Sequence, residues 1–336
     1  MIVYILIFFL AFWAGFSVRR ASLCLVRATY EIIERKPLKT SLFVLEAMVV
    51  ALSITIPAIL LFPDKIILAS TYNISWHLFL GAMVYGAGAS INGSCALGTL
   101  NQLMNGKMSF IASIIGMALG FGIFLNVQHM ADLQRFDTSI LAQYRMFFLL
   151  PVMILVWAIV FFKVRKFWNT SEENKAKKLK QYISSSVARD FIGVAIFGFC
   201  SGVLFLILGG SWDYTYFIQS LERSIYLNGA LDLSILPILV TTMALVSGIS
   251  IASYLSNDFK LKIGSPVDFI TKIIAGALMG FSVGIIPGGN DSLILYSIPG
   301  IALHAPIALM FMMMSIAITI KIGDFFRKFS IAKKEK

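Results

Sequence analysis

The sequence predicts an all-α integral membrane protein with about nine membrane-spanning helices and several short re-entrant half-helices, in two inverted repeats. Of its 336 residues, 58% are hydrophobic and 13% are charged, which is too apolar for a water-soluble domain of this length. The net charge of +11 is carried by a few short basic runs, not by a continuous basic face with exposed aromatic residues. The composition therefore predicts a lipid bilayer as the surroundings and no nucleic-acid partner.

The spans are predicted from apolar runs of about 20 residues, the length that crosses the hydrocarbon layer, and from the turn or charge signals between them. The first run has no basic residues before it and no small-residue cleavage site after it. It is therefore interpreted as a retained span and not as a signal peptide. The nine predicted spans are Ile2–Val18, Ser41–Phe62, Trp76–Ile91, Met108–Val127, Arg145–Phe162, Phe191–Gly209, Leu233–Ala252, Pro266–Ile286 and His304–Ile320.

The distribution of basic residues over alternate loops predicts the topology. One side holds only Lys65, Arg135 and Arg223. Cytoplasmic loops are enriched in Lys and Arg, so we expect the N-terminus outside and the C-terminus in the cytoplasm. The basic residues of the predicted cytoplasmic side are Arg19, Arg20, Arg27, Arg35, Lys36, Lys39, Lys107, the run from Lys163 to Arg189, Lys260, Lys262, and the tail from Arg327 to Lys336.

The two halves of the chain resemble each other at a constant offset, which pairs Gly81 with Gly276, Gly93 with Gly288 and Cys95 with Asn290. We predict a single membrane domain with a first repeat (1–128), a connecting helix and cytoplasmic linker (129–190), and a second repeat (191–336). The odd fifth span inverts the second repeat relative to the first. Inverted repeats are typical of secondary transporters, whose binding site lies at the repeat interface.

Four apolar segments are too short to cross the bilayer and are predicted to be half-helices. Non-helical backbone at membrane depth is tolerated only where protein or water satisfies its polar groups, so the breaks beside these segments indicate a conduit. The topology predicts that the Cys95 break starts from the cytoplasmic side and the Asn290 break from the outer side. The four segments are Ala21–Ile33, Ala96–Met104, Trp212–Tyr226 and Ser292–Leu303.

Three of these breaks carry residues suited to an anion: Arg19 to Cys24, Asn92 to Gly98, and Pro287 to Asp291, where an amide stands in place of the thiol. Exposed N–H groups and the positive end of the dipole at a helix N-terminus attract negative charge, and the arginines before Cys24 add to this. A neutral thiol is a weak, polarizable donor. It suits a soft sulfur anion that must be held and then released.

Other conspicuous residues receive structural interpretations. Cys200 is interpreted as a packing residue, and three cysteines are too few for a disulfide framework or a metal cluster. Glu46 and Lys272 are intramembrane charges for which function and snorkelling to the interface both stay open. The remaining interpretations are close helix packing for Gly116, Gly120, Gly276, Gly280, Gly284 and Gly288, rings that meet water at outer span ends for His77, His129 and His304, and solvated loop acids for Asp213, Asp232 and Asp258.

At the three breaks the sequence resembles the YeeE/YedE family of sulfur transporters, whose bacterial members take up thiosulfate across the inner membrane. The likeness covers nearly the whole chain. It rests on the Arg19-Arg20 to Cys24 segment, the Gly93-Ser94-Cys95 to Gly98 segment and the segment from Pro287 to Asp291.

The resemblance implies import of thiosulfate, or of a related small sulfur-containing anion, along a central path on which cysteine S–H groups pass the anion inward. Cys24 and Cys95 match two of the family's cysteine positions, and Asn290 stands at the third. The resemblance also implies a cytoplasmic TusA-like sulfur carrier as a partner, and no cofactor. The predicted substrate-binding residues are Cys24, Cys95, Asn290, Gly93, Ser94, Gly288, Gly289 and Arg20.

Two alternatives are a membrane-bound enzyme and an assembly subunit acting on sulfur compounds. An enzyme needs an activated nucleophile or a bound cofactor, and the sequence has neither a thiol with an adjacent base nor a dinucleotide-binding loop. We therefore expect a transporter and not an enzyme.

Overall fold

The computed structural model describes residues 2–21, 23–62, 66, 68–127, 151, 154–155, 157–158, 186–228, 235–257 and 259–334. Within these ranges the regular structure is helical, apart from one isolated bridge between Lys107 and Lys262. The prediction of an all-α fold is therefore confirmed for the part of the chain that is described.

Six described helices are long and apolar enough to cross a membrane. Two further predicted spans coincide with α4 (Trp76–Asn92), which has 17 residues, and α10 (Ser186–Leu208), whose apolar part is Ile192–Leu208. Most of the predicted span Arg145–Phe162 and most of the connector Lys163–Arg189 lie outside the described residues, as do His129, Asp232 and Asp258. The count of nine is thus not confirmed. The six helices are α1 (Ile2–Ala21), α3 (Lys39–Leu61), α6 (Ser109–Val127), α12 (Leu236–Leu255), α13 (Pro266–Ile285) and α15 (His304–Lys334).

Close helix packing brings the two halves of the chain together. A Cβ atom on Gly116 of α6 would collide with the carbonyl oxygen of Ile273 on α13, and one on Gly276 of α13 would collide with that of Ser113 on α6. Gly15 brings α1 against α12 in the same way. Small residues let helix backbones approach closely where lipid provides no hydrophobic driving force. The packing interpretation is therefore confirmed for Gly116 and Gly276.

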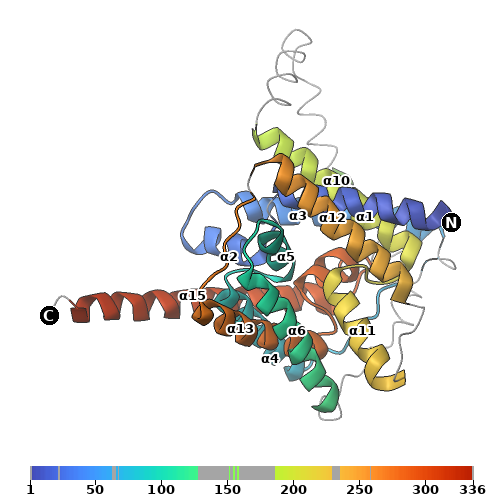
Figure 1. The fold of residues 1–336 in the computed structure, drawn as a ribbon. Coiled ribbons are helices and arrows are strands. Elements are labelled where there is room, and N and C mark those ends of the chain that lie inside the picture. Colours follow the sequence, from blue (N-terminus) through green and yellow to red (C-terminus); the bar gives the residue numbers. More distant parts are fainter. Residues whose placement is uncertain are drawn as a thin grey trace, which may run out of the picture.

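Short helices lie at the four predicted half-helices; the one at Ala96–Met104 has the predicted ends, and the other three have shifted ends. They are α2 (Leu25–Ile33), α5 (Ala96–Met104), α11 (Tyr214–Asn228) and the short α14 (Asn290–Ser292), which continues into the π-helical turn η3 (Leu293–Ser297). In Figure 1, α5 lies in the middle of the bundle, between the group of α1, α10 and α12 and the group of α4, α6 and α13. The ends of the short helices thus meet inside the bundle.

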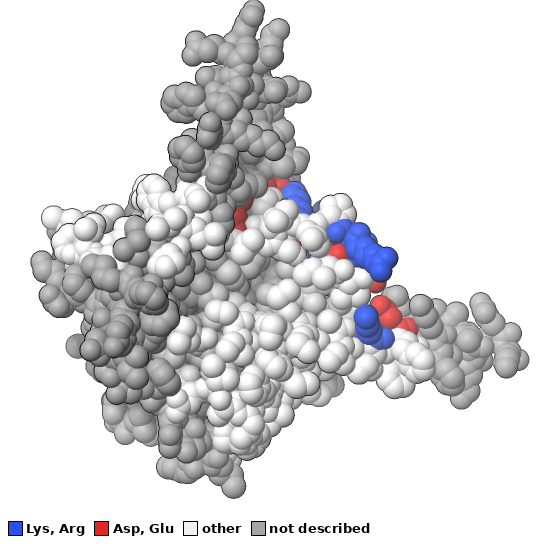
Figure 2. Space-filling view, turned by 180° about the vertical axis from the view of Figure 1, so that it is seen from behind, with Lys and Arg blue, Asp and Glu red and all other residues white. Residues whose placement is uncertain are grey.

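Two basic loops predicted to share one side of the membrane are paired. The backbone N–H of Met108 donates to Lys262 O at 2.9 Å, and that of Lys260 donates to Asn105 O at 3.0 Å. On the face that Figure 2 shows, the charged side chains of the described residues gather along one edge, with a wide uncharged surface beside them. This arrangement agrees with a membrane protein whose basic loops lie together. Which side of the membrane they face stays a prediction.

Candidate functional site

Cys24 and Cys95 occupy the same place on two different half-helices. Each is the N-cap of a nine-residue helix, α2 and α5, with an extended backbone (φ −155° and −75°). Neither side chain caps its own helix, so each thiol remains available for other contacts. The first-turn N–H groups of both helices add positive electrostatic potential at these ends.

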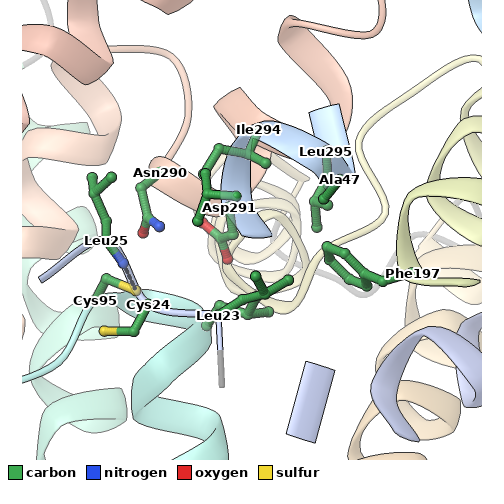
Figure 3. Close-up of a pocket in the computed structure, with 12 residues that line it drawn as sticks. Leu23, Cys24, Leu25, Ala47, Cys95, Phe197, Asn290, Asp291, Ile294 and Leu295 are labelled. Atoms are coloured by element: carbon green, nitrogen blue, oxygen red, sulfur yellow. Dashed lines mark hydrogen bonds between the residues drawn. The ribbon is translucent and has the colours of Figure 1, made fainter. Parts of the chain in front are cut away.

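The fold brings these two ends together although 70 residues separate them. The backbone N–H of Leu25 donates to Cys95 Sγ at 3.3 Å, and Cys24 Sγ lies 3.8 Å from Ser94 Oγ. Figure 3 shows Cys24 and Cys95 beside each other. Cys95 is fully buried, whereas Cys24 is half-buried.

The turn before Cys95 is held in place by Asn92. The Asn92 amide nitrogen donates to Ser94 O at 2.9 Å and to Thr99 Oγ1 at 2.7 Å. Gly93 has φ +71°, in the left-handed region, and nothing lies within 4 Å of where its Cβ would be. Glycine is favoured here by backbone conformation and not by crowding.

The third break presents an amide to the same region. Gly288 has φ +137°, and Gly289 is the N-cap of α14, with the same φ of −75° and ψ of 178° as Cys95. The structural counterpart of Cys95 is thus Gly289, one residue earlier than the sequence alignment predicts. Asn290 Oδ1 accepts a hydrogen bond of 2.5 Å from the Tyr85 hydroxyl, which leaves the Asn290 NH₂ group as a donor.

Three cavities lie along these breaks. The central cavity, of about 20 Å³, is lined by Cys24, Cys95, Asn290, Asp291 and apolar side chains (Figure 3). Its volume suffices for about one water molecule. A second cavity, of about 590 Å³, has Arg27 in its wall and is called the Arg27 cavity. It shares Leu23 and Cys24 with the central cavity.

The third cavity, of about 230 Å³, is lined by Arg223, Gly288 and Ser292 among others and is called the Arg223 cavity. Residues 288–292 thus separate it from the central cavity. The central cavity is a narrow point between two wider cavities, each with an arginine in its wall.

The predicted site residues divide among these cavities. Cys24, Cys95 and Asn290 line the central cavity, Gly93 and Ser94 line the Arg27 cavity, and Gly288 lines the Arg223 cavity. The interpretation of Gly288 as a helix-packing glycine is therefore replaced by a place in the wall of this cavity. Gly289 lines none of the three cavities; its Cβ would come 2.5 Å from Asp291 Oδ1. The Arg20 side chain lies outside the described residues, while Arg19 and Arg27 line the Arg27 cavity.

The interpretation of Asp213 as a solvated loop acid is wrong. Asp213 is fully buried and Asp291 is 1% exposed. Thr215 Oγ1 lies 2.5 Å from Asp213 Oδ1 and 3.0 Å from both carboxyl oxygens of Asp291. The start of α11 folds inward against α14, which removes this acid from water.

The interpretation of His304 is also wrong, because the ring is 1% exposed and Nδ1 accepts the backbone N–H of Tyr72 at 3.4 Å. His77 is half-buried.

Lys272 donates to the backbone oxygen of Asn92 and lies 4.0 Å from the centroid of the Phe110 ring. It therefore binds the carbonyl end of α4, where a cation is favoured.

Cys200 is buried in the apolar core and lines none of the three cavities. Its environment agrees with a packing role.

The sequence analysis did not place Tyr85, Asp213, Thr215 or Asp291 in the site. Asp291 offered a signal, because it belongs to the break from Pro287 to Asp291 and an acid at membrane depth indicates function by default. Tyr85 offered none, since its role depends on the contact with Asn290, which is 205 positions away. Among the described residues, no group of three His, Cys, Asp or Glu side chains is arranged to hold a metal ion.

Comparison with known proteins gives one family. The family described as sulphur transport matches residues 20–318, a range that contains all three cysteines and, apart from Arg19, all three breaks. No curated protein matches the chain. With its membrane-spanning helices, the chain belongs to the sulphur transport family, which confirms the resemblance to the YeeE/YedE transporters seen at the three breaks.

Proposed function

We propose that this sulfur transporter imports thiosulfate, or a closely related small sulfur-containing anion, across a bacterial inner membrane. The observation that carries the proposal is the meeting of two thiols and one amide at the narrow central cavity. The direction of transport, the preference for thiosulfate and the use of the cysteines are parts of the proposal. Family membership favours transport over catalysis.

The hydrogen-bond pattern supports the thiols and the amide as donors. Cys95 Sγ accepts the N–H of Leu25, and the thiols of Cys95 and Cys24 are hydrogen-bonded to each other. An entering anion would take over an S–H donor from this pair. Asn290 Oδ1 is occupied by Tyr85, which directs the amide NH₂ to the same use. Cys24 lines both the central cavity and the Arg27 cavity and is suited to receive the anion from Cys95.

The lining of the central cavity supports release as well as binding. It contains no Lys or Arg among the described residues. A full positive charge at about 4 Å would attract each anionic charge by about 4 kcal/mol at an effective dielectric constant of about 20, and would hold the anion too firmly for passage. Thiols, an amide and helix N-termini attract it more weakly. The arginines stand in the wider cavities, where they attract anions without trapping them.

The predicted topology gives the path a direction. It places the Arg223 cavity on the outer side and the Arg27 cavity on the cytoplasmic side. Import then runs from the Arg223 cavity past Asn290, Cys95 and Cys24 into the Arg27 cavity. A TusA-like carrier would receive the product near the basic cytoplasmic loops. The central cavity has to widen during the cycle, since its volume is about that of one water molecule.

The two repeats, 1–128 and 191–336 on either side of the connector 129–190, would supply that movement. Rocking of one repeat against the other around a fixed site is the common mode of alternating access. In this proposal, helix packing between α6 and α13 forms part of the interface between the repeats.

The test is uptake of labelled thiosulfate into cells that lack their own thiosulfate and sulfate uptake systems. We expect uptake with the wild-type chain and with Cys200→Ala, and strongly reduced uptake with Cys24→Ala at the same membrane level. Chromatography of the cell extract shortly after uptake distinguishes a transporter from a membrane-bound enzyme, because a transporter delivers unchanged labelled thiosulfate and an enzyme delivers a labelled product. Absence of thiosulfate uptake by the wild-type chain, with growth on a different sulfur source, would reject thiosulfate as the substrate.

A further inference from the structure

We propose that Asp213 and Asp291 form a proton-binding site that couples anion uptake to proton entry. The inference rests on the proposed function for its substrate and adds the ion that drives transport. It starts from the pair of buried carboxyl groups that Thr215 bridges.

The hydrogen-bond contacts of this pair leave a place for one bound proton. Asp213 Oδ2 accepts the hydroxyl groups of Ser211 at 2.6 Å and Ser292 at 2.7 Å, and Oδ1 accepts the N–H of Tyr216 at 2.9 Å. The Thr215 hydroxyl, which has one hydrogen, contacts both carboxyl groups. When it donates to one of them, a proton on the other carboxyl group would supply the second hydrogen bond, to Thr215.

The surroundings favour such shared protonation. Among the described residues neither aspartate has an ion-pair partner, and both are at least 99% buried. Two adjacent carboxylates without a cation repel each other strongly in a site of low dielectric constant, and one bound proton removes that repulsion. The pair is therefore built to bind a proton in the resting arrangement.

The pair contacts both the anion path and water. Asp291 lines the central cavity beside Asn290, with its carboxyl group directed toward the space near Leu23 (Figure 3). Ser211 and Ser292, which donate to Asp213, line the Arg223 cavity. A proton from water in that cavity can thus reach Asp291 through hydroxyl groups and Asp213.

A second observation indicates that the Arg223 cavity is suited to hold water. Gln219 lines it and is 5% exposed, and its Nε2 atom has no hydrogen-bond partner. A buried amide donor without a partner is costly, and a water molecule in this polar cavity would satisfy it. Water in the cavity would also supply protons to Ser211 and Ser292, which line it.

Among the described residues, few other titratable groups face the pair. Tyr85 on α4, Tyr214 on α11 and the thiol of Cys95 at the start of α5 interact electrostatically with Asp291 or its neighbours. Cys24 at the start of α2 lines the same cavity, and α3 and α10 contribute the apolar Val44, Ala47 and Phe197. The charged group of the adjoining cavity is Arg223. The two carboxyl groups are therefore the acids that bind the coupling proton.

The coupling mechanism follows from charge. While the pair is protonated, the side of the central cavity at Asp291 is neutral and the anion can enter beside Asn290 and Cys95. When the proton leaves toward the cytoplasm, Asp291 becomes a carboxylate. It then repels the anion toward Cys24 and the Arg27 cavity. One proton and one anion thus enter in the same cycle, and the next proton comes from the Arg223 cavity.

The test uses purified protein in liposomes that contain a pH-sensitive dye, with the membrane potential clamped at zero. Adding thiosulfate outside should acidify the interior with the wild-type chain. An acid-outside gradient of one pH unit should concentrate thiosulfate about tenfold for each coupled proton, because the tenfold proton ratio is converted into an anion ratio. The control variant is Asp268→Asn, a matched change at an exposed residue at the start of α13.

Asp291→Asn separates coupling from transport. The NH₂ group of the new asparagine can still donate a hydrogen bond to Thr215, but it cannot release a proton. We expect Asp291→Asn to exchange labelled for unlabelled thiosulfate across the membrane, with no interior acidification and a concentration ratio near one. Thr215→Val, which removes the bridge, should reduce coupling even if Asp291→Asn does not fold.

Three results would contradict the inference. Thiosulfate uptake by the wild-type chain without proton entry would overturn proton coupling while the proposed function stands. Unchanged proton entry with folded Asp291→Asn, or with Thr215→Val, would show that the coupling proton binds at other residues. Absence of any thiosulfate uptake by the wild-type chain would overturn the proposed function and this inference together.

Discussion

Replacing Cys95 by alanine is the sharpest test of the thiol path. The change removes an S–H donor and little volume, so the helix α5 and its packing should persist. A hydrogen bond to a charged group contributes about 1.5–3 kcal/mol, and its loss from the rate-limiting passage slows transport by about ten- to hundredfold. We expect uptake of thiosulfate to fall by that factor.

A second effect of the same change has to be separated from the first. Cys95 Sγ accepts the N–H of Leu25, and both residues are buried. Removing the acceptor leaves a buried N–H group unsatisfied, at a cost of about 1–3 kcal/mol in stability. Cys95→Ser restores an acceptor and a donor at this position. If lost stability caused the defect, Cys95→Ser should recover the amount of protein in the membrane.

The assay is the initial rate of labelled thiosulfate uptake at matched membrane levels for Cys95→Ala, Cys95→Ser, Cys24→Ala and Cys200→Ala. Cys200 is buried away from the three cavities, so Cys200→Ala should transport nearly as the parent does. Normal uptake by Cys95→Ala together with failure of Cys200→Ala would refute the assignment of the path to Cys24 and Cys95.

Three further predictions concern the glycines and the topology. Gly98→Ala should reduce uptake, because the new methyl group would lie 3.0 Å from Cys24 Sγ and collide with Ser94 Oγ, whereas Gly323→Ala, with open space around it, is the matched control and should transport normally. Leucine at Gly93 or at Gly288 should block uptake while the protein stays in the membrane, since both line the wider cavities and both have positive φ; normal uptake by both variants would argue against a path there. A reporter fused after Lys336 should be active in the cytoplasm, and activity only in the periplasm would reverse the predicted topology.

Electrical work explains why a coupling ion matters for this substrate. Moving one charge against a membrane potential of about 100 mV requires about 2.3 kcal/mol, so a dianion entering an inside-negative cell requires about 4.6 kcal/mol. One accompanying proton offsets about half of that electrical work. The protonated pair of Asp213 and Asp291 next to the anion path would provide this offset without a separate ion site.

The sequence by itself determined the membrane class, the places of the breaks and the family. Apolar runs and loop charges locate spans because the hydrocarbon layer imposes a length and excludes unpaired backbone groups. The same constraint makes a helix break conspicuous, so Cys24 and Cys95 were identified before their positions in space were known. Gly116 and Gly276 were correctly assigned to helix packing because their spacing repeats on one helix face.

Only the tertiary structure decided which breaks meet and which acids are buried. Cys95 contacts Leu25 across 70 residues, and Tyr85 contacts Asn290 across 205. Asp213 was interpreted as a solvated loop acid, yet it is fully buried against α14. The physical reason is that periodicity and charge report each segment's exposure to lipid or water, whereas hydrogen bonds between distant half-helices depend on how those segments pack.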